Sequence, residues 1–369
     1  MTERVGLVLS GAAARGPYQA GALAVLLPAL AEQGRRPQVL LGTSSGGITA
    51  ALVAQCADLP PDDAGRLVEE TWIGFGDVFR NPLCTPGPAA AVVARLAGLG
   101  VVGAPGALLD VTPLRTRAGE LFRPDRVAAN LASGAVESVA VAATVCPPAR
   151  SAARSRLFVQ GAVPPPAFAV DVVPVALRLD HLLASAAIPG MFPPVLLDEP
   201  AVGAGWYVDG GVRLNAPLRP AVDLGVDRLV VVSGHSVDPP PVLPAAPPFR
   251  APDLASTAAM SVRAILADGL ADDVNTLRRK NRRPGHRVVP HLVVAPADGE
   301  LAALAADSFA PAGPWDPYWA IGRLLDSLGD GGGRDELLSL VLFREAYARA
   351  QAEQGRRDAA AALAAGWTT

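Results

Sequence analysis

The sequence predicts an α/β fold with a parallel, or mostly parallel, central sheet flanked by helices. Short apolar runs alternate with helical segments between residues 5 and 56, and half of the 369 residues are hydrophobic. Strand, helix, strand and helix in this order form right-handed βαβ units, in which neighbouring strands are parallel. A hydrophobic chain of this length also buries a sizeable core, as a flanked sheet requires.

The first unit takes its bounds from apolar runs and helix breakers. Residues 5–9 are typical of a buried strand, and Pro17 can open the helix predicted over 18–33. A second strand is expected at 38–41 and a second helix at 48–56. Further strands are expected in the apolar runs 136–145, 157–159, 228–233 and 288–294.

The rest of the chain predicts additions to this core. We place the core at 1–235, with a helical insert at 59–125 that would cap the site. The proline-dense segment 238–253 is expected to be a surface loop. Residues 254–369 are expected to form a helical extension packed on the core, with an amphipathic helix at 337–354.

Charge and cysteine content exclude several classes of protein. A formal net charge of −3 gives no electrostatic reason to expect nucleic acid as a partner. The three cysteines lie far apart and the four histidines have no ligand-like spacing, so we expect neither a disulfide framework nor a metal site. No N-terminal signal precedes the first predicted strand, which predicts a cytoplasmic protein. No pattern indicates an oligomeric state.

Membrane contact depends on one segment. Residues 86–109 carry Arg95 as their single charge, and their apolar side chains would suit peripheral contact with a bilayer. A cap helix packed against its own domain would have the same composition. Both interpretations stay open at this point.

A serine motif follows the second predicted strand. Gly42-Thr43-Ser44-Ser45-Gly46 fits G-x-S-x-G, in which a strand turns sharply into a helix and the central serine projects at the apex. Gly42 and Gly46 would leave the space that the backbone of this nucleophile elbow needs. Ser44 is therefore a candidate nucleophile, and Ser45 a candidate cap of the following helix. A plain glycine-serine loop at a helix start is the alternative.

The turn after the first strand, SGAAARG, has two interpretations. Gly11, Ala13 and Gly16 take the positions of a dinucleotide-binding turn, which would suit a nucleotide-binding oxidoreductase. The alternative is an oxyanion loop, because adjacent parallel strands end side by side and this turn would lie next to Ser44. Alanine at the middle glycine position favours the oxyanion loop, with Arg15 bracing it.

A third motif ends in an acid. The run WYVDGG at 206–211 places Asp209 after a short apolar stretch, and such a segment is ordinarily a turn. Three further segments accompany it: LSGAAARGPYQAGAL at 9–23, GTSSGG at 42–47 and ASAAIPGMFPP at 184–194. Together and in this order, the four segments resemble the patatin-like phospholipase family over the predicted core.

The resemblance implies a serine acyl hydrolase. Ser44 would be the nucleophile and Asp209 its partner in a Ser-Asp dyad. The reaction would be cleavage of acyl esters of lipids through an acyl-enzyme, of the phospholipase A or lysophospholipase type, without metal or cofactor. The oxyanion would be held by the backbone amides of Gly11, Ala12 and Ala13, and their loop supported by Arg15 and Gly16. Burial is expected to raise the pKa of Asp209.

The glycine-rich turn departs from the family pattern. Family members usually have glycine where Ala12 and Ala13 stand. A positive φ at either alanine would cost about 1–3 kcal/mol, unless Gly11 carries the unusual torsion instead.

Two further assignments have alternatives. Ser44, Asp209 and His235 follow the chain order of an α/β-hydrolase triad, but only one strand precedes Ser44, which favours the dyad. Met191 and Phe192 are candidates for acyl-pocket contacts, and core packing is the alternative for both.

Overall fold

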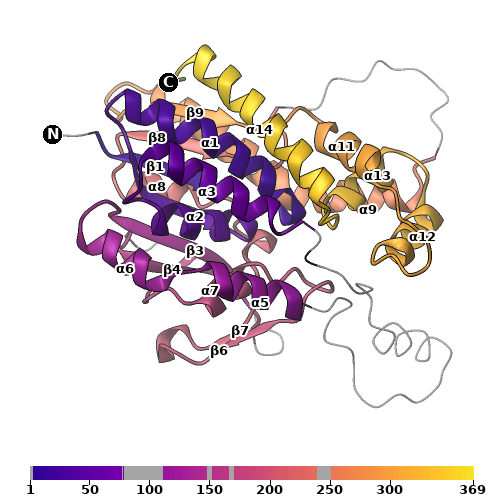
Figure 1. The fold of residues 1–369 in the computed structure, drawn as a ribbon. Helices are drawn as coiled ribbons and strands as arrows, with labels where there is room; N and C mark the ends of the chain where they lie inside the picture. Colours follow the sequence, from indigo (N-terminus) through magenta and orange to yellow (C-terminus); the bar gives the residue numbers. More distant parts are fainter. Residues whose placement is uncertain (1–2, 77, 79–110, 148–151, 166–169, 239–250) are drawn as a thin grey trace.

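The computed structural model describes residues 3–76, 78, 111–147, 152–165, 170–238 and 251–369 (Figure 1). The strands are β1 Val5–Leu9, β2 Pro37–Thr43, β3 Ser138–Val145, β4 Arg154–Gly161, β5 Val170–Pro174, β6 Val195–Leu197, β7 Gly205–Asp209, β8 Arg228–Val232 and β9 His291–Val294. Within the described ranges they form a nine-stranded sheet with the order β5-β4-β3-β2-β1-β8-β9, while β7 pairs with β3 and β6 with β7. The pairs from β3 through β2, β1 and β8 to β9 are parallel, whereas β4 and β7 run antiparallel to β3. The predicted α/β class with a mostly parallel sheet is confirmed.

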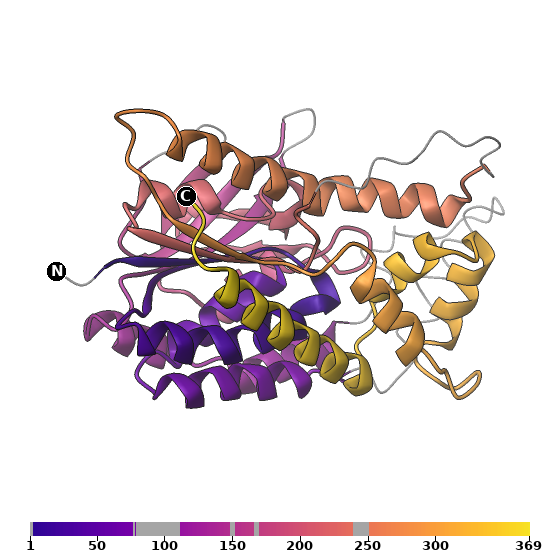
Figure 2. The same ribbon diagram turned by 90° about the horizontal axis from the view of Figure 1, so that it is seen from above.

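Helices cover both faces of this sheet (Figure 2). One face carries α1 Gly16–Glu32, α2 Ser45–Gln55, α3 Pro61–Ile73 and α14 Glu345–Ala365, and the other α8 Leu218–Asp223 and α10 Gly269–Asn281. Alternate residues of a strand point to opposite faces, so in β1 Leu7 and Leu9 pack toward α1 and Val8 toward α8. Both faces are buried, which explains why the central strands are continuous apolar runs.

Seven further helices complete the described part of the fold. They are α5 Thr112–Leu121, α6 Pro124–Ala132, α7 Leu179–Ser185, α9 Leu254–Arg263, α11 Glu300–Ser308, α12 Trp319–Leu328 and α13 Gly332–Ser339. Short turns of 3₁₀ helix occur at η1 Ala13–Arg15, η2 Ala201–Gly203 and η3 Gly210–Val212, and η4 Ala264–Asp268 is a π-helical turn between α9 and α10.

The predicted helix at 337–354 is wrong, because the chain leaves helical geometry between α13 and α14. The carbonyl of Leu340 accepts the N–H of Ala14 (3.2 Å), and the N–H of Phe343 donates to the hydroxyl of Tyr318 (2.8 Å). These bonds to distant segments replace the bonds that a continuous helix would make. Strands β5, β6 and β7 are additional to the predicted ones.

The predicted apolar segment 86–109 lies wholly outside the described residues, and the predicted proline-dense segment 238–253 lies outside them except at its ends. By length and composition alone, one helix in the described part, Leu254–Asn281, could cross a membrane. Its second half, however, packs Leu270, Val274 and Leu277 into the core beneath the sheet.

Candidate active site

Ser44 occupies a sharp turn between β2 and α2. Its backbone has φ +55° and ψ −128°, a strained conformation for a residue with a side chain. A Cβ on Gly42 would lie 2.1 Å from the carbonyl oxygen of Gly46, and one on Gly46 would lie 2.4 Å from that of Leu9. The two glycines therefore allow the close backbone approach that the G-x-S-x-G pattern predicts.

Two other serines hold this turn in place. The N–H of Ser44 donates to Ser185 Oγ (2.7 Å), whose hydroxyl donates to the carbonyl of Ala142 on β3 (2.6 Å). Ser45 does not cap α2 as predicted, because its Oγ instead accepts the N–H of Ala12 (3.0 Å). Both hydroxyls thus connect the turn to neighbouring segments of the chain.

Asp209 lies beside Ser44, although 165 positions separate them. Ser44 Oγ donates to Asp209 Oδ2 at 2.6 Å, and Asp209 Oδ1 accepts the N–H of Gly211 at 2.7 Å. The sheet sets this contact, since Asp209 at the end of β7 pairs with Ala143 on β3, the neighbour of β2. Both side chains are buried.

The surroundings of Asp209 change its acidity. Burial raises the pKa of Asp209 from 3.8 to about 6, against the hydrogen bonds from Ser44 and Gly211, which lower it. A carboxylate with a pKa near 6 is still mostly ionised at neutral pH and is a stronger base than an exposed one. The predicted rise in pKa is therefore present.

The three amides predicted to hold an oxyanion are not equivalent. The N–H of Gly11 donates to the carbonyl of Asn215 (2.8 Å), and that of Ala12 donates to Ser45 Oγ. Ala13 opens η1, so its N–H has no partner within that helix, and it makes no other hydrogen bond in the described structure. Two of the three predicted donors therefore already have partners, and the N–H of Ala13 is the one left free among the described residues.

The strain expected in this loop falls on Ala13. Its φ is +51°, whereas Gly11 has no positive φ, so Gly11 does not carry the unusual torsion. The conformation of Ala13 costs about 1–3 kcal/mol. Ala13 lines the cavity beside Ser44, so the strained residue is also the one with the free amide.

Asn215 is a site residue that the sequence reasoning missed. Besides accepting the N–H of Gly11 through its backbone carbonyl, it donates from Nδ2 to the Gly11 carbonyl (3.1 Å) and to that of Leu266 in η4. A Cβ on Gly11 would lie 2.2 Å from Asn215 Oδ1, which explains the glycine. Asn215 therefore holds the peptide groups on both sides of Gly11 and connects them to the π-helical turn.

Arg15 braces the same loop from the other side. Its guanidinium pairs with Glu336 (2.7 Å) and donates to Ser339 Oγ on α13 and to the carbonyl of Gly234 (3.2 Å). The neighbouring Gly16 begins α1, where a Cβ would overlap the ring of Trp72 at 2.4 Å. Arg15 is not among the residues that line the cavity at Ser44.

His235 does not join Ser44 and Asp209. It follows β8, and β1 lies between β8 and β2, with Leu9 paired to Val232 on one side and to Gly42 on the other. The imidazole instead contacts Arg15 through Nδ1 (3.0 Å). Burial, with Arg15 and Arg263 nearby, lowers its pKa well below 6.5. The triad alternative is therefore not supported by the position of His235.

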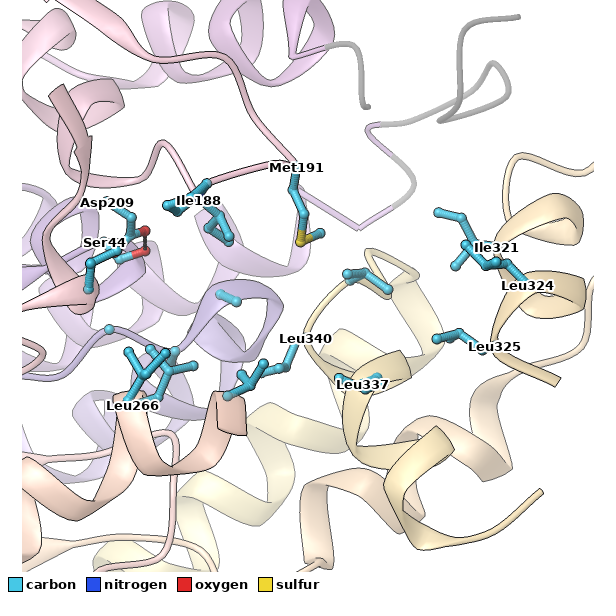
Figure 3. Close-up of a pocket in the computed structure, with 18 residues that line it drawn as sticks. Ser44, Ile188, Met191, Asp209, Leu266, Ile321, Leu324, Leu325, Leu337 and Leu340 are labelled. Carbon is cyan, nitrogen blue, oxygen red and sulfur yellow. Dashed lines mark hydrogen bonds between the residues drawn. The ribbon is translucent and has the colours of Figure 1, made fainter. Parts of the chain in front are cut away.

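A cavity of about 440 Å³ opens from Ser44 and Asp209 (Figure 3). Its walls are almost entirely apolar, and half of the lining residues come from the C-terminal part of the chain, with Leu266 from η4, Leu325 from α12 and Leu337 from α13. Figure 3 shows the dyad at one end and the side chains of α12 at the other. This size is within the range of ligand-binding cavities.

The two predicted pocket residues lie on different sides of Ser44. Met191 lines the large cavity. Phe192 is buried and borders a second, much smaller apolar space with Trp72 and Phe75. The C-terminal wall of the large cavity was not predicted, because the amphipathic pattern of a helix shows that one face is buried without showing which partner covers it.

Comparisons with known proteins give one family. A family model described as patatin-like phospholipase matches residues 7–222, a range that includes Ser44, Asp209 and the first turn but not His235. Among solved structures, the crystal structure of VipD from Legionella pneumophila matches with 14% sequence identity and a TM-score of 0.37, covering 100% of this chain and 68% of that one. A comparison with curated proteins found no match.

Proposed function

The chain belongs to the patatin-like phospholipase family, and we propose that it hydrolyses acyl esters of lipids with Ser44 and Asp209 as a catalytic dyad. The observation that carries this proposal is the 2.6 Å hydrogen bond between Ser44 Oγ and Asp209 Oδ2 at the end of an apolar cavity. Lipid acyl hydrolysis in general follows from the family, and the roles of the two residues are our assignment.

In the first half-reaction, Ser44 Oγ attacks the ester carbonyl carbon and its proton passes to Asp209 Oδ2. The negative charge that develops on the carbonyl oxygen lies next to the free N–H of Ala13 and the N-terminus of α2. Asp209 then gives the proton to the departing alcohol oxygen as the carbon–oxygen bond breaks. The acyl group remains on Ser44 as an ester.

In the second half-reaction, water takes the place of the alcohol. Asp209 accepts a proton from the water as its oxygen attacks the acyl carbon, and returns that proton to Ser44 Oγ as the acid leaves. The raised pKa of Asp209 supports both transfers, because a base with a pKa near 6 is ionised at neutral pH and still accepts a proton readily. The cavity walls would bury an apolar acyl chain.

The test is a panel of acyl esters and phospholipids together with labelling by a fluorophosphonate, which reacts with activated serines. Wild type should hydrolyse the esters and be labelled at Ser44, and Ser44→Ala should lose both properties. Ser133→Ala is the control, since this hydroxyl lies at the end of α6, where it donates to the carbonyl of Asn130 (3.1 Å). Labelling of Ser44→Ala, or its absence from wild type with no ester hydrolysed, would refute the proposal.

A further inference from the structure

The mouth of the large cavity is surrounded by exposed apolar side chains. Val212 after β7, Ile265 in η4 and Leu324 in α12 are 42%, 52% and 55% exposed, and all three also line the cavity. A side chain that both faces solvent and lines a cavity marks its opening. The opening therefore lies where three separate elements each leave a large apolar residue in water.

The helical segments α9–η4 and α12, which carry Ile265 and Leu324, expose further apolar residues. Met260 lies on the exposed face of α9, and no exposed residue from Leu254 to Ile265 is charged. Trp319 at the start of α12 is also exposed, and Trp315 just before it is 92% exposed. We call Val212, Met260, Ile265, Trp315, Trp319 and Leu324 the mouth patch. Tryptophan in particular is enriched where protein meets the interfacial region of a bilayer.

Two exposed arginines are direct sequence neighbours of mouth-patch residues. Arg213 and Arg323 are exposed neighbours of Val212 and Leu324, and neither forms an ion pair with any residue that the structure describes. By contrast, Arg263 on α9 is paired with Asp298. Two unpaired guanidinium groups beside an apolar opening suit a surface that carries negative charge.

We propose that the mouth patch docks the enzyme on a lipid surface that contains anionic phospholipid, so that substrate passes from that surface directly into the cavity at Ser44. This inference rests on the proposed function, and it names the surface through which the site meets its substrate. A second copy of the chain fits less well, because a two-fold contact through this patch would bring the arginines of both copies into one interface.

The helix that carries part of the patch would lie along the surface and not across it. Its length and composition would allow a span, but Leu270, Val274 and Leu277 pack in the core. Only the first half, from Leu254 to Ile265, presents an uncharged face to solvent. This half is the part that would rest on lipid.

Vesicle binding tests the proposal in the Ser44→Ala protein, which would leave the lipid intact. Vesicles of phosphatidylcholine, alone or mixed with phosphatidylglycerol, are sedimented with the protein. Met260→Asp combined with Trp319→Asp changes two residues that do not line the cavity, and should weaken binding at least about tenfold. Arg213→Gln combined with Arg323→Gln should weaken binding to the mixed vesicles and leave binding to pure phosphatidylcholine vesicles unchanged. Binding of this variant to the mixed vesicles should also be less sensitive to salt.

The matched control is Leu196→Asp combined with Val202→Asp, two exposed apolar residues on β6 and η2 that do not line the cavity. This control should bind vesicles as the parent does. Unchanged binding by the Met260 and Trp319 variant, or an equal loss in the control, would overturn the proposal. It would also be overturned if the parent dimerises without lipid and the variant does not, because the patch would then contact a second copy.

A soluble ester separates docking from catalysis. With Ser44 restored, the Met260 and Trp319 variant should hydrolyse a monomeric short-chain ester at the wild-type rate, while its rate on phospholipid in vesicles falls. If wild type hydrolyses no ester but the vesicle results are as expected, the proposed function fails and the docking surface stands. Loss of soluble-ester hydrolysis in the variant would instead indicate damage to the site and count against a separate docking role.

Discussion

The buried carboxylate of Asp209 should destabilise the protein at neutral pH, and Asp209→Asn tests this. Burial raises the pKa of Asp209 from 3.8 to about 6, so between these values the native state holds a proton that the unfolded chain has released. The free energy of unfolding therefore falls as pH rises through this interval. A pKa difference of about two corresponds to about 3 kcal/mol, which Asp209→Asn should recover between about pH 4 and pH 7.

The measurement is urea unfolding of wild type and Asp209→Asn at a series of pH values. The replacement also removes hydrogen-bond capacity, but that term changes little with pH, so the slope of the difference isolates the carboxylate. Asp171→Asn is a control of opposite sign, because the Arg154 guanidinium lowers the pKa of Asp171 and its carboxylate stabilises the fold as pH rises. A difference for Asp209→Asn that stays constant, or decreases, as pH rises would refute the reasoning.

Four further outcomes are expected. The kcat/KM of wild type should fall below about pH 6 as Asp209 gains a proton, and a decline that begins only near pH 4 in a pH-rate profile would contradict its role as base. Ala13→Gly should raise the free energy of unfolding by about 1 kcal/mol, measured by urea unfolding, because relief of the positive φ exceeds the added chain entropy. Asn215→Ala should lower kcat about 100-fold by releasing the first turn, whereas Asn281→Ala, which removes an equally buried amide far from the site, should lower stability and leave kcat nearly unchanged. His235→Ala should keep most of the turnover on a soluble ester, and a loss as large as that of Asp209→Asn would favour a triad.

The parts of the fold that could be predicted are those with local causes. β1 agrees with the predicted strand residue for residue, because an uninterrupted apolar run is buried on both faces and stops where the chain must turn. β6 and β7 were missed for the opposite reason. Leu196 and Trp206 are apolar but half exposed, so their pattern does not report burial, and both strands depend on pairing with distant partners.

The site, too, has features with local causes, which could be predicted, and features that depend on distant residues, which could not. The elbow at Ser44 could be predicted because Gly42, Gly46 and the apolar run before them act within a few residues of one another. Nothing in the sequence around Asp209 shows that it meets Ser44, and only the resemblance to a family linked them. The sequence could not show whether Gly11 or Ala13 has the positive φ. The backbone at Gly11 is held by hydrogen bonds to Asn215, which is 204 positions away in the chain.

The unfavourable features of this structure converge on the same few residues. Among the described residues other than glycine, Ala13 and Ser44 alone have a positive φ, and they border one cavity. Asp209, which touches Ser44, is a buried carboxyl that no cationic side chain pairs with among the described residues, and its raised pKa reflects the cost of ionising it there. Each of these features lowers stability. Strain, a buried carboxyl and an open apolar cavity occur together where the proposed binding and proton transfer would need them, so the geometry indicates the site independently of the family resemblance.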